Sequence, residues 1–347
     1  MTPGSGDGNG RVGVSLIFTV RNEASSIGHL LEAIDAQTRQ PDQVVALDGG
    51  SSDDTVDQIK KWAESRNNVA VGVLPGANIS TGRNQAIALA DGPLIAVTDA
   101  GCQPAPDWLE ELVAPLEKDP SVRFSMGFYE AEASGYFEKL SACLNIPDEK
   151  EVAPEKFMPS SRSVAFPKAV WEAVHGYPEW LEVGEDMFLN FTVRTARLKR
   201  AFAPKAIVRW RMRPGLRSFM RQYYHYARGD SLGGMYMYRH AARFFAYIAF
   251  AALAPLWLIA PIWLLFPAAL GAVWLRRPFR RAFRRLSLPG ALGALVALPV
   301  LEVLMDLAKM AGYLTGIGQT WKRFTPPKTS GRPAEAAPDR ESEPADP

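Results

Sequence analysis

The first hundred residues alternate short apolar runs with segments in which apolar residues recur at helical spacing. The segments 27–34 and 56–62 each place their apolar side chains on one side of a helix. Near-continuous apolar strands that alternate with helices predict a parallel sheet covered on both faces, and therefore an α/β fold. The strands are predicted at 12–20, 43–47, 69–74 and 93–97.

The pattern changes in the second half of the chain. Between about 121 and 211 it loosens into shorter strands and helices, which predicts a mixed edge on the sheet. Residues 244–275 carry no charge, a run longer than the roughly 20 residues that one membrane-spanning helix needs. A single span would send the arginine-rich segment 276–285 to the far side of the membrane. A hairpin of two short helices returns it to the side of the α/β domain, as the positive-inside tendency favours, and we prefer this interpretation.

These changes divide the chain into regions. The first eleven residues lack the apolar run of a secretory signal, so export is not expected. The last residues are rich in Pro, Ala, Glu and Asp, which is typical of disorder. A third apolar helix, at about 289–317, either spans the membrane or lies at its interface. The predicted regions are a flexible lead at 1–11, an α/β domain at 12–230, a membrane-associated region at 231–322 (hairpin about 244–275, basic loop 276–285, third helix) and a tail at 323–347.

Charge and cysteine usage narrow the partners. Lys and Arg number 39 against 37 Asp and Glu, so the balance predicts no polyanionic partner such as nucleic acid. Arginines concentrate in the second half, which favours a membrane surface as their counterpart. Two cysteines and no Cys/His cluster with zinc spacing indicate neither a disulfide framework nor structural zinc. We expect a multi-pass protein of the cell membrane with its α/β domain in the cytoplasm.

Polar clusters follow three of the predicted strands. They are RNE at 21–23, DGGSSDDT at 48–55 and TDAGC at 98–102. In an open parallel sheet, ligands bind outside the carboxyl ends of the strands, so these clusters should converge. Asp48 offers acceptor oxygens to a base or a ribose, and the two glycines after it permit close backbone approach. The same residues also suit an ordinary strand-to-helix turn.

Two further motifs carry candidate chemistry. Arg83 and Asn84 precede the fourth strand on a predicted helix, and their position relative to Asp99 favours contact with a phosphate or nucleotide over a plain surface role. The tripeptide GED at 184–186 supplies two carboxylates, although acidic residues also commonly begin a helix.

Together these motifs resemble family 2 glycosyltransferases of the GT-A fold over about the first 230 residues. The resemblance rests on TVRNEASSIGHLLEAIDAQT, DGGSSDDT, GRNQAIALADG, VTDAGC and GED, in this order. It implies a Rossmann-like, mostly parallel sheet flanked by helices and followed here by C-terminal membrane helices. It also implies a nucleotide-diphosphate sugar donor, usually a divalent metal, and inversion at the anomeric carbon.

The resemblance assigns roles to individual residues. Asp48 would contact the base or ribose, and Arg83 with Asp99 would frame the sugar diphosphate. Asp186 would be the general base that removes the acceptor hydroxyl proton. The candidates are Asp186 and Glu185 for catalysis, Arg21, Glu23, Asp48, Arg83, Asn84, Asp99 and Arg228 for donor binding, Ser161 and Arg162 on the acceptor side, and Asp99 for the metal.

Arg228 comes from the segment RPGLRSFMRQYYHYARGDSLGG, which resembles the arginine-rich stretch that closes over the donor diphosphate in membrane-attached members of the family. An arginine suits that role because its planar fork pairs with phosphate oxygens. For Arg217 and Arg221 a basic face resting on lipid headgroups is an equal alternative.

The sequence departs from the family pattern at two positions. The second metal aspartate is replaced by Gly101, and Trp210 stands where a histidine is common. Mg²⁺ or Mn²⁺ often binds through one carboxylate plus substrate phosphates, so Asp99 can suffice. The rival interpretation is an enzyme that uses little metal and relies on Arg83 and Arg228.

Three functions fit these observations to different degrees. The leading hypothesis is a membrane-attached inverting glycosyltransferase with a lipid-linked or glycan acceptor. The second is a membrane-anchored nucleotide-sugar binding or scaffold protein without turnover, which the two departures motivate. The third, a polysaccharide synthase, ranks last because the chain has RQYYHYARG in place of a Gln-x-x-Arg-Trp signature.

Overall fold

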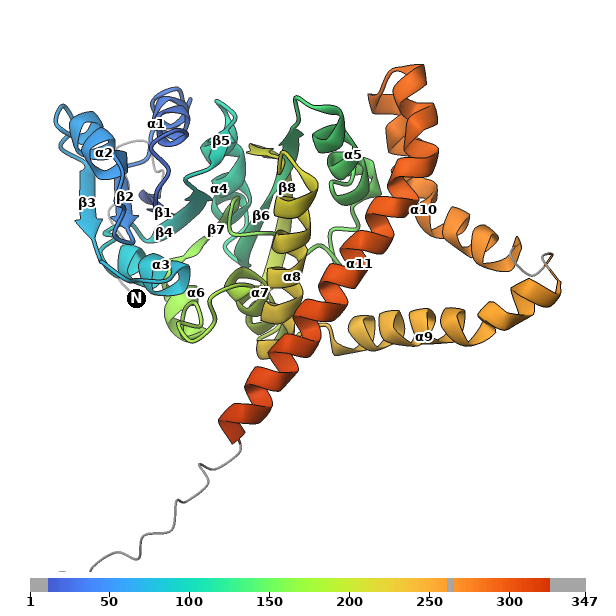
Figure 1. Cartoon of the computed structure of the whole chain (residues 1–347). Helices are drawn as coiled ribbons and strands as arrows, with labels where there is room; N and C mark the ends of the chain where they lie inside the picture. The colour runs from blue at the N-terminus through green and yellow to red at the C-terminus, as the bar shows by residue number, and fades with distance from the viewer. Residues whose placement is uncertain (1–11, 261, 263–264, 325–347) are drawn as a thin grey trace, which may run out of the picture.

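The structure of the protein is a computed structural model that describes residues 12–260, 262 and 265–324. The expected lead at 1–11 and most of the expected tail lie outside the described residues. One eight-stranded sheet, with strand order β3-β2-β1-β4-β7-β6-β8-β5, organises the N-terminal part (Figure 1). The strands are β1 (Val14–Val20), β2 (Gln43–Asp48), β3 (Val69–Val73), β4 (Leu94–Asp99), β5 (Cys102–Pro104), β6 (Val122–Glu132), β7 (Val164–Pro167) and β8 (Lys199–Arg211).

The sheet is mostly parallel, as the sequence predicts. β1 to β4 pair in parallel, and β6 pairs in parallel with β8. Only β7 and β5 run the other way, because β7 is antiparallel to β4 and β6, and β5 is antiparallel to β8. The α/β class and the mixed edge are confirmed.

Helices cover both faces of the sheet and bury separate apolar cores. Alternation along β1 sends Leu16 and Phe18 to one core and Ile17 to the other, as the two-residue period of a strand requires. The first core is covered by α1 (Ile27–Asp35), α2 (Thr55–Ala63) and α4 (Trp108–Lys118), and the second by α3 (Ile79–Ala88), α6 (Lys168–Ala173) and α7 (Glu185–Thr195).

The longest strands of the sheet lie where the sequence pattern predicted short ones. β6 has 11 residues and β8 has 13, and they pair with register shifts near Val122 and Met126. These irregularities and the polar residues of β8 interrupt the apolar alternation, which explains the difference.

The C-terminal helices form a separate layer against the α/β domain. Helix α11 crosses α8, and α9 and the first part of α10 extend away from the domain as two arms (Figure 1), whereas the rest of α10 packs against α5 and α11. Gly312 and Gly316 allow α11 to lie close to α8, since a Cβ at Gly312 would come 2.0 Å from the carbonyl oxygen of Tyr224. The helices are α5 (Tyr136–Asn145), α8 (Leu216–Leu232), α9 (Met237–Ile259), α10 (Leu265–Arg285) and α11 (Leu288–Phe324), with a 3-10 turn η1 at Glu149–Glu151.

The segment 276–285, expected to be a basic loop, is instead the last part of helix α10, so that prediction was wrong. Its last three arginines bind acidic residues of the α/β domain, whereas Arg276, Arg277 and Arg280 are exposed. Arg281 is buried, pairs with Glu151 at 2.7 Å and donates to the carbonyl oxygen of Cys143 at 2.9 Å. Arg284 and Arg285 both pair with Asp148. These pairs fix the helix against α5 and η1.

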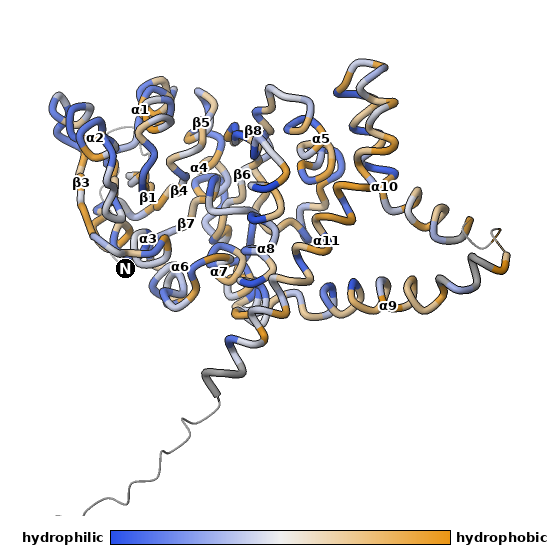
Figure 2. The backbone as a smooth tube through the Cα atoms, in the orientation of Figure 1, coloured by the Kyte–Doolittle hydropathy of each residue, from blue (hydrophilic) through white to orange (hydrophobic). Residues whose placement is uncertain are grey.

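The surfaces of α9, α10 and α11 are largely apolar (Figure 2). Within the described residues, the segment Leu288–Thr320 is long and apolar enough to cross a membrane by length and composition. A third of its most apolar stretch is nevertheless buried against the rest of the protein. Exposed large apolar residues on the two arms include Phe245, Ile248, Phe250, Leu253, Ile259, Leu265, Leu270, Val273 and Trp274.

Candidate active site

Two cavities meet at the carboxyl end of β4, on either side of Asp99. The first cavity, about 970 Å³, lies over the ends of β1, β2 and β4 and is bordered by residues 210–214. The second cavity, about 430 Å³, lies between α7 and the helices α8, α9 and α11. Asp99 and Arg162 line both cavities. A ligand in one cavity would therefore meet a ligand in the other at this pair.

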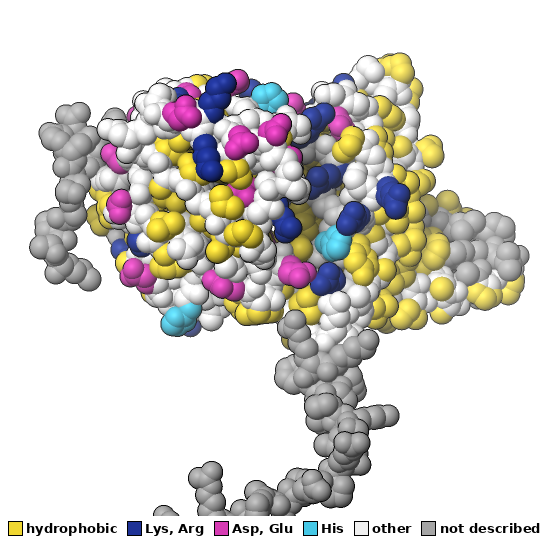
Figure 3. All heavy atoms as spheres, turned by 60° about the vertical axis from the view of Figure 1, so that its left-hand side comes forward, with side chains coloured by type: hydrophobic (Ala, Val, Ile, Leu, Met, Phe, Trp, Pro, Cys, Tyr) yellow, Lys and Arg dark blue, Asp and Glu magenta, His cyan; other side chains and the backbone are white. Residues whose placement is uncertain are grey.

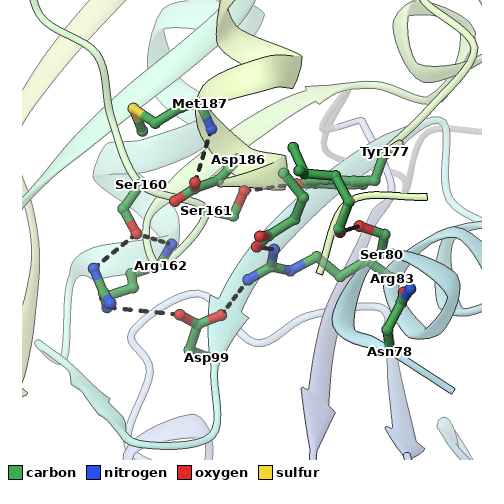
Figure 4. Close-up of polar contacts among 12 residues, drawn as sticks. Asn78, Ser80, Arg83, Asp99, Ser160, Ser161, Arg162, Tyr177, Asp186 and Met187 are labelled. Carbon is green, nitrogen blue, oxygen red and sulfur yellow. Dashed lines mark hydrogen bonds and ion pairs between the residues drawn. The ribbon is translucent and has the colours of Figure 1, made fainter. Parts of the chain in front are cut away.

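Arg83 joins two carboxylates at this junction (Figure 4). Its Nη2 donates to Asp99 Oδ1 and its Nη1 donates to Glu185 Oε1, each at 2.6 Å, and its side chain is 2% exposed. A charge this deeply buried persists only when it is paired. Burial opposes the charged form, but Asp99 and Glu185 raise the pKa of Arg83, so the guanidinium stays charged.

The two carboxylates respond differently to the same arginine. Burial acts to raise the pKa of Asp99, but the charges of Arg83 and Arg162 outweigh it and hold that pKa below its usual value. Burial and the neighbouring Asp186 carboxylate raise the pKa of Glu185 to about 7, in spite of its pairing with Arg83. Carboxyl groups with perturbed pKa values inside a cavity are typical of functional sites.

Arg162 approaches Asp99 from the side opposite Arg83 (Figure 4). Its Nε lies 3.6 Å from Asp99 Oδ2, and its Nη1 donates to Ser160 Oγ at 3.0 Å. The guanidinium carbon lies 4.1 Å from the centre of the Trp210 ring, which orients it by cation–π contact. The sequence suggested Arg162 for the acceptor side alone, whereas the structure puts it at the junction of both cavities.

Asp186 lies in the first turn of α7 and lines the second cavity. Gly184 precedes the helix with φ +89°, a backbone conformation that favours glycine. Asp186 Oδ1 accepts a hydrogen bond from the Met187 backbone N–H at 2.7 Å. Its other carboxylate oxygen has no hydrogen-bond partner within the described part of the chain, so it can accept a proton from a ligand.

Asn84 and Ser161 support the site without lining either cavity. Asn84 Oδ1 accepts from Trp171 Nε1 and from the Tyr177 backbone N–H, and its Nδ2 donates to the carbonyl oxygen of Tyr177, each at 2.9 Å. Ser161 Oγ lies 2.9 Å from the hydroxyl of Tyr177, whose ring in turn lies 5.2 Å from the Arg83 guanidinium carbon. Both residues thus fix the ring against which Arg83 rests.

In the polar clusters at 21–23 and 48–55, the acidic side chains mainly accept hydrogen bonds from their own loops. Asp48 is 1% exposed, and its Oδ1 accepts from the backbone N–H groups of Gly50 and Ser51 at 2.7 Å. Glu23 accepts a hydrogen bond from Ser26 Oγ. Arg21 is exposed and lines the first cavity. The arginines that line this cavity are Arg21, Arg162, Arg211 and Arg213.

Arg228 lies apart from the junction. Its Nη2 is 3.3 Å from Glu182 Oε2 and its Nε donates to Gln319 Oε1 at 3.1 Å, so it connects α8 to α11 and to the loop before α7. It does not line either cavity. Glu182, which lines both, had no motif that could have marked it. The same is true of Tyr177, because an isolated aromatic residue carries no sequence signal.

The described residues include no group of three or more His, Cys, Asp or Glu side chains able to hold a metal ion. The carboxylate at the end of β4 that the sequence assigns to a metal is Asp99, whose oxygens already face Arg83 and Arg162. Gly101 leaves open space, since a Cβ there would meet no atom within 4 Å. These residues fit a divalent ion only when most of its oxygen ligands come from a bound substrate.

Comparison with known proteins shows that the α/β domain is similar to glycosyltransferases. Residues 15–163 match the family described as "Glycosyl transferase family 2". The O-antigen chain rhamnosyltransferase RfbN of Salmonella typhimurium is 27% identical over 211 residues, which are 56% of this chain and 65% of that protein. The undecaprenyl-phosphate 4-deoxy-4-formamido-L-arabinose transferase of Serratia proteamaculans is 32% identical over 114 residues, which are 30% of this chain and 34% of that protein. The chain thus spans about two thirds or less of the length of these relatives.

A solved structure shows the same fold. The mannosyltransferase PcManGT of Pyrobaculum calidifontis, in complex with GDP-Man and Mn²⁺, aligns with 90% of this chain and 88% of its own, at a TM-score of 0.53 and 21% identity. The α/β domain therefore has the GT-A fold that the sequence predicts.

Proposed function

Since residues 15–163 match glycosyl transferase family 2, we propose that this protein transfers a sugar from a nucleotide-diphosphate sugar to an acceptor hydroxyl, with inversion at the anomeric carbon. The observation that carries the proposal is the junction of the two cavities at Asp99 and Arg162. A transfer between two substrates needs two binding spaces that meet where a bond is exchanged.

The donor occupies the first cavity in this proposal. The arginines that line it suit a diphosphate because each guanidinium can pair with two phosphate oxygens. Arg162 is the best placed of them, since Trp210 and Ser160 hold it beside Asp99. Asp48 then acts mainly by fixing the loop over which the nucleoside lies.

The acceptor occupies the second cavity, with its hydroxyl at Asp186. In the reaction, the acceptor oxygen attacks the anomeric carbon and its proton passes to the free carboxylate oxygen of Asp186. The bond between the anomeric carbon and the diphosphate oxygen breaks, and the nucleoside diphosphate leaves with that electron pair. Arg162 stabilises the charge that develops on the leaving group, and Arg83 fixes Asp99 and Glu185 around it. Glu185 is a positioning residue in this scheme.

A divalent ion, Mg²⁺ or Mn²⁺, is part of the proposal. Asp99 and the donor phosphates would hold it, and it would neutralise part of the charge on the leaving diphosphate. The structurally similar mannosyltransferase carries Mn²⁺ together with its donor, which supports this assignment. Because Asp99 is the one carboxylate assigned to the metal, we expect a weaker metal site than one with two carboxylate ligands.

The acceptor is proposed to be lipid-linked and the protein to act at the cytoplasmic face of the cell membrane. Two relatives named above are an undecaprenyl-phosphate transferase and an O-antigen chain rhamnosyltransferase. The apolar surfaces of α9 and α10 support insertion of these helices as a hairpin, with the second cavity close to the membrane. The arginines at the end of α10 stay with the α/β domain, as expected for the cytoplasmic side.

The first test separates donor binding from turnover. Purified full-length protein in nonionic detergent is titrated with UDP-, GDP- and dTDP-sugars, with Mn²⁺ or with EDTA, and the thermal unfolding midpoint is followed. We expect one nucleotide class to raise the midpoint, and metal to strengthen the effect. If no nucleotide sugar raises the midpoint, the proposal is refuted. If a nucleotide sugar binds but no sugar is transferred to lipid extracts, the scaffold function is favoured.

The second test concerns Asp186. The variant Asp186→Asn should bind the donor as the wild type does and lose activity by roughly 10²- to 10⁴-fold, the usual contribution of a general base. The variant Asp57→Asn, at an exposed position on α2, is the matched control. If Asp186→Asn keeps full transfer activity, Asp186 is not the base.

A further inference from the structure

The end of the second cavity away from Asp99 is formed by the C-terminal helices and is rich in cations. Arg239 and Arg243 of α9 and Lys309 of α11 line it, together with His240 and Asp230. Figure 3 shows basic side chains gathered where the α/β domain meets the apolar C-terminal helices. This part of the cavity lies outside the match to family 2, which ends at residue 163.

The contacts divide these residues into two groups. Arg243 pairs with Asp306 at 2.6 Å, and His240 Nε2 lies 3.0 Å from Asp230 Oδ2, so both carboxylates already have partners within the protein. Arg239 and Lys309 pair with no carboxylate among the described residues. Both side chains line the cavity, and Arg239 is also exposed to solvent.

Aromatic rings hold the two unpaired cations in place. The Arg239 guanidinium carbon lies 4.9 Å from the centre of the Tyr236 ring, and Lys309 Nζ lies 4.9 Å from the centre of the Tyr223 ring. A cation held by the face of a ring keeps all its N–H donors available, whereas pairing with a carboxylate occupies one or two of them and offsets the charge. This arrangement suits an incoming anion.

We propose that Arg239 and Lys309 form a binding subsite for a phosphoryl group, such as the phosphate or diphosphate that joins a lipid to the sugar it carries. This inference rests on the proposed function, because it assigns the phosphate-bearing part of the acceptor to the helical end of the cavity and the hydroxyl to Asp186. A volume of about 430 Å³ accommodates a sugar and a phosphate, and the exposed apolar side chains of α9 lie beyond it to receive a lipid chain.

The position of Lys309 gives the proposal a second argument. It lies in helix α11, within the segment Leu288–Thr320, which is long and apolar enough to cross a membrane, and a charged residue there is costly unless it is used. Asp306 and Glu302 of the same helix already have partners, in Arg243 and in the indole N–H of Trp274. No carboxylate among the described residues pairs directly with Lys309, so its N–H donors can bind an incoming anion.

The experiment measures binding of short prenyl phosphates to the full-length protein in nonionic detergent. The probes are farnesyl diphosphate, farnesol as its uncharged match, and inorganic phosphate, and dissociation constants come from isothermal titration calorimetry. We expect farnesyl diphosphate to bind at least about tenfold more tightly than farnesol. Lys309→Met and Arg239→Gln should each lower the affinity for farnesyl diphosphate by roughly tenfold, and Lys309→Arg should retain most of that affinity.

Controls separate this subsite from general attraction and from the donor site. Arg276→Gln, at an exposed position on α10, should leave the affinity unchanged. Equal weakening by Arg276→Gln, or wild-type affinity in Lys309→Met and Arg239→Gln, would overturn the proposal. Binding of nucleoside diphosphates is measured on the same samples. If they bind and farnesyl diphosphate does not, the subsite fails while the proposed function stands; the reverse result refutes the donor site alone.

A last arm identifies the source of the phosphoryl group. Nanodiscs of phosphatidylglycerol and of phosphatidylcholine are compared for their ability to displace farnesyl diphosphate. Displacement by phosphatidylglycerol that depends on Lys309 and Arg239 assigns the subsite to a lipid headgroup. If neither kind of nanodisc displaces farnesyl diphosphate, the result supports a lipid-linked acceptor.

Discussion

Replacing Glu185 by Gln tests whether the carboxyl group beneath the cavity junction resists ionisation. Glu185 is 6% exposed and its pKa is about 7, against an ordinary value of 4.5. Because folding raises this pKa, the folded protein holds the proton more tightly than the unfolded chain does. The stability that this group contributes is therefore fully present below pH 4.5 and is lost as the pH rises to about 7. The gap between the two pKa values corresponds to roughly 3 kcal/mol of the free energy of unfolding.

Glutamine has the shape of protonated glutamate and cannot ionise. At pH 4.5 we expect Glu185→Gln and the wild type to be nearly equal in stability, and at pH 8 the variant should be more stable by roughly 3 kcal/mol. For a chain of this size that gain is a rise in the unfolding midpoint of roughly 5 °C. The assay is thermal unfolding of detergent-solubilised protein from pH 4.5 to 8, with Glu64→Gln, at an exposed position after α2, as the control.

The refuting result is a variant that is less stable than the wild type at pH 8. That outcome would mean that the attraction between Glu185 and Arg83 exceeds the cost of burying the charge, and that Glu185 is ionised throughout. An identical pH dependence for both proteins would show that Glu185 does not titrate between pH 4.5 and 7. Either result would also remove the argument for Glu185 as a group tuned by its neighbours.

Two further predictions concern the metal site and helix α10. Gly101→Asp restores a second carboxylate in open space, so we expect Mn²⁺ to bind roughly tenfold more tightly, as measured by electron paramagnetic resonance; a gain of the same size in Gly101→Asn would contradict the charge argument. Arg281→Met leaves the carboxylate of Glu151 without its partner and should lower stability by about 3 kcal/mol in thermal unfolding, whereas Arg280→Met, at an exposed position, should change little; equal effects would show that the pair does not hold α10.

The periodicity of the first hundred residues carried most of the information about the fold. Strand and helix periods differ, so the order of elements, the parallel sheet and the convergence of polar residues at its carboxyl edge could all be predicted. Sequence could not predict that segment 276–285 is helical, because its arginines find Asp148 and Glu151 more than 120 residues earlier in the chain. Taken alone, a dense run of like charges predicts a loop, because the repulsion between them disfavours a helix. Distant carboxylates that pair with the charges remove that repulsion.

The candidate site divides in the same way. Sequence motifs predicted Arg83, Asp99 and Asp186 as site residues, since each lies next to a strand or helix that the sequence pattern predicts. Tertiary structure alone decided that Arg83 joins Asp99 to Glu185 and that Arg162 faces both cavities, because ion pairs between residues up to 102 positions apart form only when the sheet and α7 come together. It also decided that Asn84 fixes the Tyr177 loop. The sequence determined which side chains were available, and the packing of the chain determined which of them became partners.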